Sequence, residues 1–473
     1  MSYGSKRRTF LKAAGVGLLG GLAGCTRGAE QKTPADSETS SSGESKTVSI
    51  PLKEYAKANI KWTKYDGDSI NIGAVKHPWV DAIKPAVPVF EELTGINVKW
   101  NILPEQEFRT KRLTDVSTGA GKFDVFFMDQ VVNQFRQSGW IQPLDPYFDS
   151  GELFDESWYQ PNDLLGVCRE AAHGAGRADM WTGMPITVEV LTTFYRKDLY
   201  KKHDLSIPKT FADLRANAKI IHENENGVVG GVARGQKGYG MNIYIQNAWI
   251  RAFGKKLWNT YPSDSALDSE PAIAAGKSYI NLLQNYGPAG SASQTWSDAL
   301  STMQSGKAGH IFADANLFWD GLTDPEASSV SDSIGITKMP VPDTSGGRFA
   351  PNAFTWQIST SKNAKNSEAG FLFMLWATST PTMNWMHVKN GAPFPVREST
   401  WLNKDFKKQV RAKYAEVSLH SLKNAIGDPF DPKYPEWGQK YSEKLQTAIA
   451  GNQSVEKAFR SAAKQAEQIA TTG

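Results

Sequence analysis

The sequence predicts an α/β fold around a parallel sheet, and three observations support this. Segments that alternate apolar and polar residues, as strands do, occur between segments whose apolar residues recur at helical spacing. Residues 124–128 form an almost continuous apolar run, which is typical of a strand buried on both faces. This alternation of strands with helices indicates βαβ units, and therefore parallel strands.

The expected elements follow in chain order. Residues 69–75 alternate as a first strand, and a helix from Pro85 to Leu93 ends at Gly95, which suits a helix C-cap. A second strand is expected at 96–100, and a helix at 108–116 is expected to carry its charged residues on the outer face. Those charged residues are Arg109, Lys111, Arg112 and Asp115. Further strands are expected at 124–128, 184–195, 227–233, 308–313 and 334–337, and further helices from 209 and at 267–285, 296–305, 367–377 and 454–469.

The first 25 residues have the pattern of an export signal. A basic head, Lys6-Arg7-Arg8, precedes an apolar run at 13–23 that is shorter than the roughly 20 residues needed to cross a bilayer. Residues 7–12 resemble a twin-arginine signal, and Leu22-Ala23-Gly24-Cys25 resembles a lipobox, in which the Cys is lipidated after cleavage. We therefore expect export and a lipid anchor on Cys25; the alternative is an uncut apolar N-terminus.

Charge and cysteine content narrow the possible functions. The chain has 53 Lys+Arg and 49 Asp+Glu, a net charge of +4, and four of the basic residues lie in the signal segment. The remaining chain is balanced, so we expect no nucleic-acid partner. Cys168 is the only cysteine besides Cys25, which predicts a buried free thiol and no disulfide within the chain.

Residues 26–66 are rich in Ser, Thr, Glu, Lys and Gly, which predicts a flexible tether.

In the body, two pairs of polar residues follow predicted strands: Lys76-His77 after the first and Asp129-Gln130 after residue 128. Ligands of open α/β sheets bind beyond the carboxyl ends of strands, so the sequence predicts a ligand cleft there. Asp129 could instead cap the helix that follows it.

Short motifs in a fixed order resemble the family-1 extracellular solute-binding proteins of ABC importers. These motifs are Phe90-Glu91-Glu92-Leu93-Thr94-Gly95, Asp124-Val125 with Asp129, Pro185-Ile186 with Val188-Glu189, Tyr195 with Lys197-Asp198-Leu199, Pro208-Lys209-Thr210-Phe211, and Gly391-Ala392-Pro393. The resemblance implies a periplasmic-binding-protein type II fold, with two discontinuous α/β lobes and a ligand cleft at the hinge. We expect one lobe at 67–188 and 339–380, and the other at 189–338 and 381–473.

The resemblance also implies where ligand contacts lie. Glu189 falls in the motif that crosses between the lobes, where it could bind ligand or form a hinge salt bridge. The remaining candidates implied by the resemblance are Gln236, Tyr239, Asn247, Asn316, Trp319, Asn352, Phe354, Trp356, Arg397 and Trp437. Arg397 could equally brace its loop, and any of the Trp residues could belong to the core.

The function implied is capture of a sugar, oligosaccharide or polyol by a monomeric, membrane-anchored lipoprotein that delivers it to ABC permease subunits. No cofactor or metal site is expected, because the 7 His are scattered and no Cys/His cluster suggests zinc. The alternatives are a binding protein for a polyamine, metal or anion, and a secreted carbohydrate-active hydrolase. The sequence contains no nucleophile or metal-protease motif, so we expect no enzymatic activity.

Overall fold

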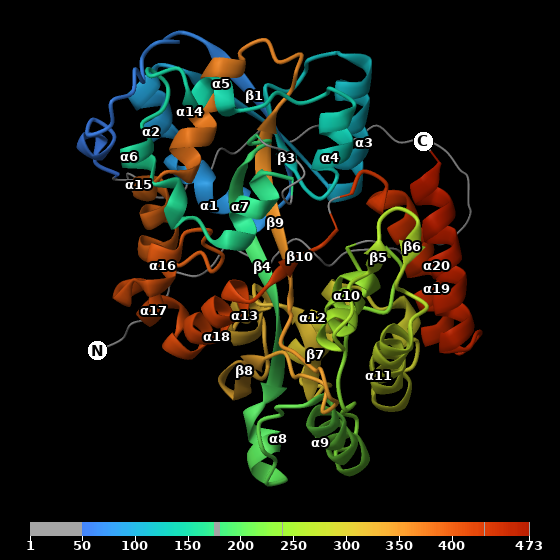
Figure 1. Cartoon of the computed structure of the whole chain (residues 1–473). Coiled ribbons are helices and arrows are strands. Elements are labelled where there is room, and N and C mark those ends of the chain that lie inside the picture. The colour runs from blue at the N-terminus through green and yellow to red at the C-terminus, as the bar shows by residue number, and fades with distance from the viewer. Residues whose placement is uncertain (1–49, 175–179, 239, 430, 473) are drawn as a thin grey trace, which may run out of the picture. The chain divides into compact units, whose positions relative to one another are not determined.

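The computed structural model describes residues 50–174, 180–238, 240–429 and 431–472, all of which belong to the unit that begins at Ile50 (Figure 1). Its strands are β1 Ser69–Val75, β2 Asn97–Leu103, β3 Val125–Met128, β4 Met184–Arg196, β5 Trp258–Thr260, β6 Asp264–Ser265, β7 His310–Ala315, β8 Ile334–Lys338, β9 Asn352–Thr360 and β10 Ile426–Gly427. β5 and β6 form a separate small hairpin, and the others make one sheet in the order β2-β1-β3-β9-β4-β7, with β8 beside β4 and β10 beside β9.

The helices are distributed along the whole of this unit. Those before β4 are α1 Pro78–Ile83, α2 Val87–Thr94, α3 Glu105–Thr118, α4 Val132–Gln137, α5 Asp145–Phe148, α6 Glu156–Tyr159 and α7 Gly166–Ala172. Those between β4 and β9 are α8 Lys197–Lys202, α9 Phe211–Asn224, α10 Asn242–Ala252, α11 Glu270–Tyr286, α12 Trp296–Gln304 and α13 Phe318–Thr323. Those after β9 are α14 Ser367–Thr378, α15 Thr380–Met383, α16 Glu398–Leu402, α17 Lys404–Val410, α18 Ala412–Lys423, α19 Tyr434–Ile449 and α20 Val455–Thr471, with a π-helix at Asn384–Lys389.

The sheet is only partly parallel. β2, β1 and β3 are parallel to one another, as the sequence predicts, but β9 pairs antiparallel with both β3 and β4. β4 is long because it serves two groups of strands. Its first part, Met184–Val190, pairs with β9, and its second part, Leu191–Arg196, lies between β7 and β8.

Helices pack around each part of the sheet. α14 contacts β3, β4 and β9, while α10, α11, α19 and α20 surround a second apolar core that includes Trp249, Tyr279 and Phe459. In Figure 1, α14 lies near β1, and α8 and α9 lie at the far end of β4. The sequence places an apolar stripe on the last helix, and Ala462 and Ala466 of α20 are indeed buried after the Ser454 N-cap.

Two predictions about elements need correction. Residues 227–233 do not form a strand, because only isolated bridges join Val229 to Ala308 and Val232 to Ile311. On α3, Lys111 is exposed as expected, but Arg112 and Asp115 are buried. Arg112 donates to the Phe127 carbonyl, and Asp115 accepts from the backbone at 122 and 123, so both charges have buried partners.

The segment 50–66, at the end of the predicted tether, packs onto the body. Tyr55 is fully buried and its hydroxyl bonds Thr382 Oγ1 at 2.8 Å. The Trp62 indole donates to the Tyr55 carbonyl, and its ring contacts Trp158 edge to face at 5.9 Å. These three aromatic rings bury apolar surface that the polar composition around them does not suggest.

Candidate functional site

The floor of the candidate site is one face of the β4–β9 pair. Thr187 lies opposite Trp356, and Glu189 lies opposite Phe354. Directly opposed residues point to the same face of a sheet, and so do residues two apart on one strand. The four side chains therefore share a face, on which the rings of Phe354 and Trp356 are 5.1 Å apart. A carboxylate beside two flat rings is thus fixed by strand register alone.

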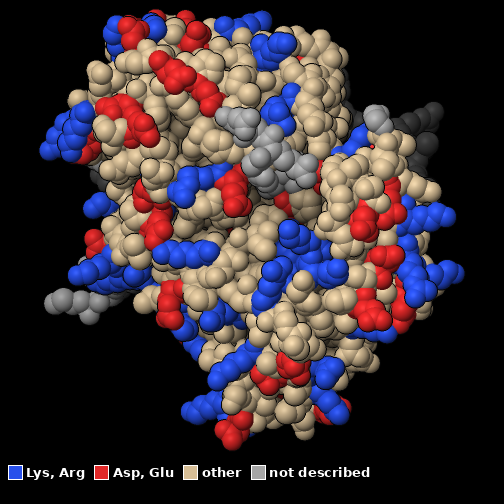
Figure 2. Space-filling model, in the orientation of Figure 1, with Lys and Arg blue, Asp and Glu red and all other residues tan. Residues whose placement is uncertain are grey.

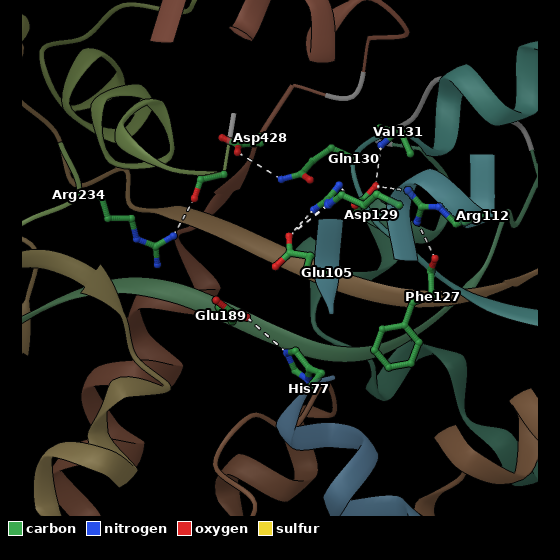
Figure 3. A network of polar contacts seen from close by, with 12 residues as sticks. His77, Glu105, Arg112, Phe127, Asp129, Gln130, Val131, Glu189, Arg234 and Asp428 are labelled. Carbon is green, nitrogen blue, oxygen red and sulfur yellow. Dashed lines mark hydrogen bonds and ion pairs between the residues drawn. The ribbon is translucent and has the colours of Figure 1, made fainter. Parts of the chain in front are cut away.

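His77 approaches this face from the end of β1. Its Nδ1 accepts from the Trp79 backbone and caps α1, so Nε2 carries the proton of the neutral ring. Nε2 lies 4.0 Å from Glu189 Oε1, and the two side chains face each other in Figure 3. The His77 ring also contacts Trp356, with centroids 5.9 Å apart. The neighbouring Lys76 is exposed.

Asp129 follows β3, as predicted, but it is fully enclosed by protein. Its carboxylate forms ion pairs with Arg109 and Arg112, and Oδ1 also accepts from the Val131 backbone at 3.2 Å (Figure 3). The capping alternative is wrong, because the N-cap residue of α4 is Val131 and no side chain caps this helix. Burial alone would raise the pKa of Asp129, but the two guanidinium groups hold it below its usual value. Asp129 therefore reaches the site through Arg109, whose guanidinium lies 5.6 Å above the Trp356 ring.

Arg234 and Tyr244 border the candidate site next to Phe354. Arg234 Nε donates to both oxygens of Asp314, at 2.9 and 3.1 Å, and Arg234 Nη1 donates to the Gly240 carbonyl. The guanidinium stacks 4.9 Å above the Tyr244 ring, which contacts Phe354 at 6.4 Å. From the sequence we predict ligand contacts in the loop that carries Arg234 and after the strand that carries Asp314. The sequence did not identify Arg234 and Asp314 themselves. A charged residue at the end of an apolar strand, as at 314, is the signal that could have identified the pair.

A second buried acid lies beside β10. Asp428 accepts from Asn247 Nδ2 at 3.0 Å, from Asn352 Nδ2, and from Gln130 Nε2 at 3.4 Å. Burial raises its pKa to about 6, although Arg251 nearby lowers it. Two candidates from the sequence, Asn247 and Asn352, thus hold this carboxylate. Asp428 itself has no local pattern that would have identified it.

Other candidates are held by protein contacts. Asn316 bonds the Val190 backbone and the Tyr414 hydroxyl, and the Trp319 indole donates to the Val410 carbonyl. The Trp437 indole bonds Asp431 within the second core.

Arg397 donates to the Thr378 and Gln160 carbonyls, which is the bracing alternative that the sequence left open. Gln236 is half-buried, with its backbone N–H bonded to the Gln294 carbonyl. Tyr239 and Cys25 lie outside the described residues. A ligand contact by Asn316, Trp319, Trp437, Arg397, Gln236 or Tyr239 stays a prediction, and so does the lipid on Cys25.

Other chemistries find little support in the described part of the chain. It contains no group of three or more His, Cys, Asp or Glu arranged to hold a metal ion. Burial raises the pKa of the Cys168 thiol to about 12, so it is a poor nucleophile at neutral pH. No described helix is long and apolar enough to cross a membrane. On the face shown in Figure 2, acidic and basic side chains are interspersed rather than gathered into one large patch of a single sign.

The chain is similar in sequence to known proteins. The model of the bacterial extracellular solute-binding protein family matches residues 74–384. The chain is 27% identical to the mannitol-binding protein of Pseudomonas aeruginosa, over 78% of this chain and 81% of that protein. It is 25% identical to the erythritol/L-threitol-binding protein of Mycolicibacterium smegmatis, over 72% of each chain.

Solved structures show the same fold. An ABC transporter solute-binding protein from Agrobacterium vitis S4 with bound D-mannitol superposes with a TM-score of 0.72 at 26% identity, covering 85% of this chain and 98% of that one. Maltose-bound MalE3 of T. maritima gives 0.73 at 20% identity, covering 85% and 100%. These matches confirm the two-lobed type II periplasmic-binding-protein fold.

Proposed function

Because the chain belongs to the bacterial extracellular solute-binding protein family, we propose that it captures an uncharged polyol or small sugar and delivers it to an ABC permease. The observation that carries this proposal is the shared face of β4 and β9, where Glu189 lies beside Phe354 and Trp356. A polyol has hydroxyl groups that donate to a carboxylate and C–H groups that pack on aromatic rings. Relatives that bind mannitol, erythritol or L-threitol support the polyol class.

A thermal-shift screen of the purified protein tests this proposal. The screen contains D-mannitol, erythritol, ribitol, maltose, putrescine and phosphate. A ligand at about 100 times its Kd should stabilise the fold by roughly 2.7 kcal/mol. We expect a rise in Tm with an alditol or sugar, and recovery of that compound unaltered. A rise with putrescine or phosphate alone would contradict the proposal, and conversion of the sugar would favour a hydrolase.

We further propose that the protein is exported and held at the outer face of the cytoplasmic membrane by a lipid on Cys25. The order of basic head, apolar run and Cys supports this. Expression in a bacterial host followed by fractionation tests it. Cys25→Ser should move the protein from the membrane fraction to the soluble one, while Cys168→Ser, which changes the other cysteine, should leave it membrane-bound. Retention of Cys25→Ser in the membrane fraction would contradict the anchor.

We propose that the hinge between the lobes lies where β4 stops pairing with β9 and begins to pair with β7, close to the predicted lobe boundary at 188/189. Val190 is the last β4 residue paired with β9, and Leu191 is the first paired with β7. A strand shared by two groups of strands can flex at the junction while each group stays intact. The lobes would then be 67–188 with 339–380, and 189–338 with 381–473.

A further inference from the structure

The arginines around the candidate site are all occupied by protein oxygens. A guanidinium available to a ligand would be the expected partner for a carboxylate or phosphate. The contacts are Arg109 with Glu105 and Asp129, Arg112 with Asp129 and the Phe127 carbonyl, Arg234 with Asp314 and the Gly240 carbonyl, and Arg251 with Asn352 and the Ile426 and Gly427 carbonyls. These guanidinium groups are therefore already engaged as donors within the fold, and those of Arg109, Arg112 and Arg234 are paired with a carboxylate.

Glu189 differs from the other carboxylates of the site. Asp129, Asp314 and Asp428 are buried and bonded to protein donors. The Glu189 side chain is 14% exposed, and the one basic group of the described residues within 4.0 Å of it is the His77 imidazole, which is charged only when protonated. No described residue donates a hydrogen bond to it. Glu189 is thus a carboxylate that a ligand can reach.

A ligand on the β4–β9 face meets this negative charge directly. A hydroxyl or ammonium group would donate to Glu189 in a charge-assisted hydrogen bond. A ligand carboxylate would be repelled, since a partly buried site screens charge weakly and the arginines are engaged elsewhere. The exposed Lys76 offers little relief, because solvent and salt screen its ammonium group.

We infer that the site selects by charge: it accepts an uncharged alditol and rejects the aldonate with the same carbon skeleton, with Glu189 as the specificity-determining residue. This inference rests on the proposed function and adds to it which charged derivatives of a polyol the site excludes. An amino-alditol, which carries a positive charge, should be tolerated. The protein would then admit reduced sugars while excluding their oxidised acids.

Calorimetric titration tests the inference with D-mannitol, D-mannonate and 1-amino-1-deoxy-D-mannitol, and with erythritol and D-erythronate. Wild-type protein should bind the aldonate at least 30-fold more weakly than the matching alditol. Glu189→Gln, which removes the charge and keeps the shape, should narrow that gap at least tenfold, equivalent to about 1.4 kcal/mol. Glu107→Gln removes the same charge from the exposed side of α3 and should leave the gap unchanged.

The outcomes separate the inference from the proposed function. If no alditol or sugar binds, the proposed function fails and the inference fails with it. If the alditol binds and the aldonate binds within threefold of it, only the inference is overturned. An unchanged gap in Glu189→Gln would remove Glu189 from that role.

Salt dependence in the wild type gives a test that does not rely on the variant folding. Repulsion by Glu189 predicts that aldonate binding does not weaken at 0.5 M NaCl, and strengthens only slightly because salt screens a partly buried contact little, while alditol binding does not change. Aldonate binding that weakens with salt would indicate an attractive cation and overturn the inference.

Discussion

At the scale of single residues, the structure distinguishes tryptophans that the sequence proposed alike as ligand contacts. Trp356 lies on the β4–β9 face, beneath Arg109 and beside His77. Trp437 is fully buried among Trp258 and Tyr434 in the second core. A tryptophan is therefore part of the candidate site at position 356 and part of the second core at position 437.

Trp356→Leu should weaken alditol binding more than tenfold, because it removes the flat ring but keeps an apolar side chain in the sheet. Calorimetric titration measures the Kd. Trp437→Phe is the matched control, since it loses the indole hydrogen bond to Asp431 and part of the ring volume inside the second core, and leaves the β4–β9 face unchanged. We expect Trp437→Phe to lower Tm and leave the Kd unchanged. The reverse pattern would exclude Trp356 from the ligand site.

Asp428 makes stability depend on pH. Its pKa is about 6 in the fold because of burial, against 3.8 ordinarily, so the folded protein holds a proton that the unfolded chain releases. The associated stability is complete below about pH 4 and is lost as the pH rises through 6. Wild-type protein at neutral pH therefore bears the cost of a buried charge.

Asp428→Asn should remove this dependence. The amide oxygen can accept from Asn247 and Asn352, and Gln130 can rotate its amide because its Oε1 has no partner among the described residues. Relative to wild type, we expect the variant to gain on the order of 2 kcal/mol of unfolding free energy between pH 4.5 and 7.5. Urea denaturation at several pH values measures the difference; a difference independent of pH would contradict the assignment.

At the scale of elements, Arg397 connects segments that are distant in sequence. Its guanidinium donates to the Thr378 carbonyl at the end of α14 and to the Gln160 carbonyl after α6, and it lies 4.7 Å above the Tyr159 ring. The carbonyls at helix ends have no partner inside the helix, so a buried donor that reaches two such segments fixes their relative position.

Arg397→Lys should lower the unfolding free energy by more than 2 kcal/mol, because an ammonium cannot reproduce the planar set of donors. Alditol affinity should stay the same. Arg460→Lys, on the exposed side of α20, is the control and should stay within 0.5 kcal/mol of wild type. Urea denaturation and calorimetry distinguish the cases: lost affinity with unchanged stability would identify Arg397 as a ligand residue instead.

At the scale of the whole molecule, the chain reaches each group of strands more than once. β4 pairs with both groups, and the chain passes back from β8 to β9, which pairs with β3 and the first part of β4 more than 150 residues after β4. Such crossings permit a hinge, and ligand bound on the shared face would favour the closed arrangement only if it contacts both sides.

Saturating alditol should shorten the distance between spin labels on α3 and α9. We expect this for labels at Lys111→Cys and Lys219→Cys, both exposed positions, in a background without Cys25 and Cys168. Labels at Lys219→Cys and Lys277→Cys, within one predicted lobe, should keep their distance. Double electron–electron resonance measures the distance between the labels of each pair. Equal behaviour of the two pairs on addition of ligand would contradict hinge closure at the β4 junction.

Much of the fold could be predicted from local patterns. The strand at 69–75, the buried run before Asp129 and the capped helices at Thr210 and Ser454 follow from residues within a turn or two of each other. Three residues that the sequence proposed as ligand contacts, Glu189, His77 and Trp356, lie together on one face, and their contact with a ligand stays a prediction. Arg234, Asp314 and Asp428 were missed, since their partners lie far away in sequence.

The sequence by itself determined the alternation of strands and helices, the export signal pattern and the family, because each is encoded in neighbouring residues. Only the tertiary structure decided that β9 runs antiparallel to β3 and β4, that Arg112 and Asp115 are buried, and which carboxylates have partners. The physical reason is distance along the chain. Burial and charge pairing depend on residues tens to hundreds of positions apart, and local periodicity carries no information about which of them meet.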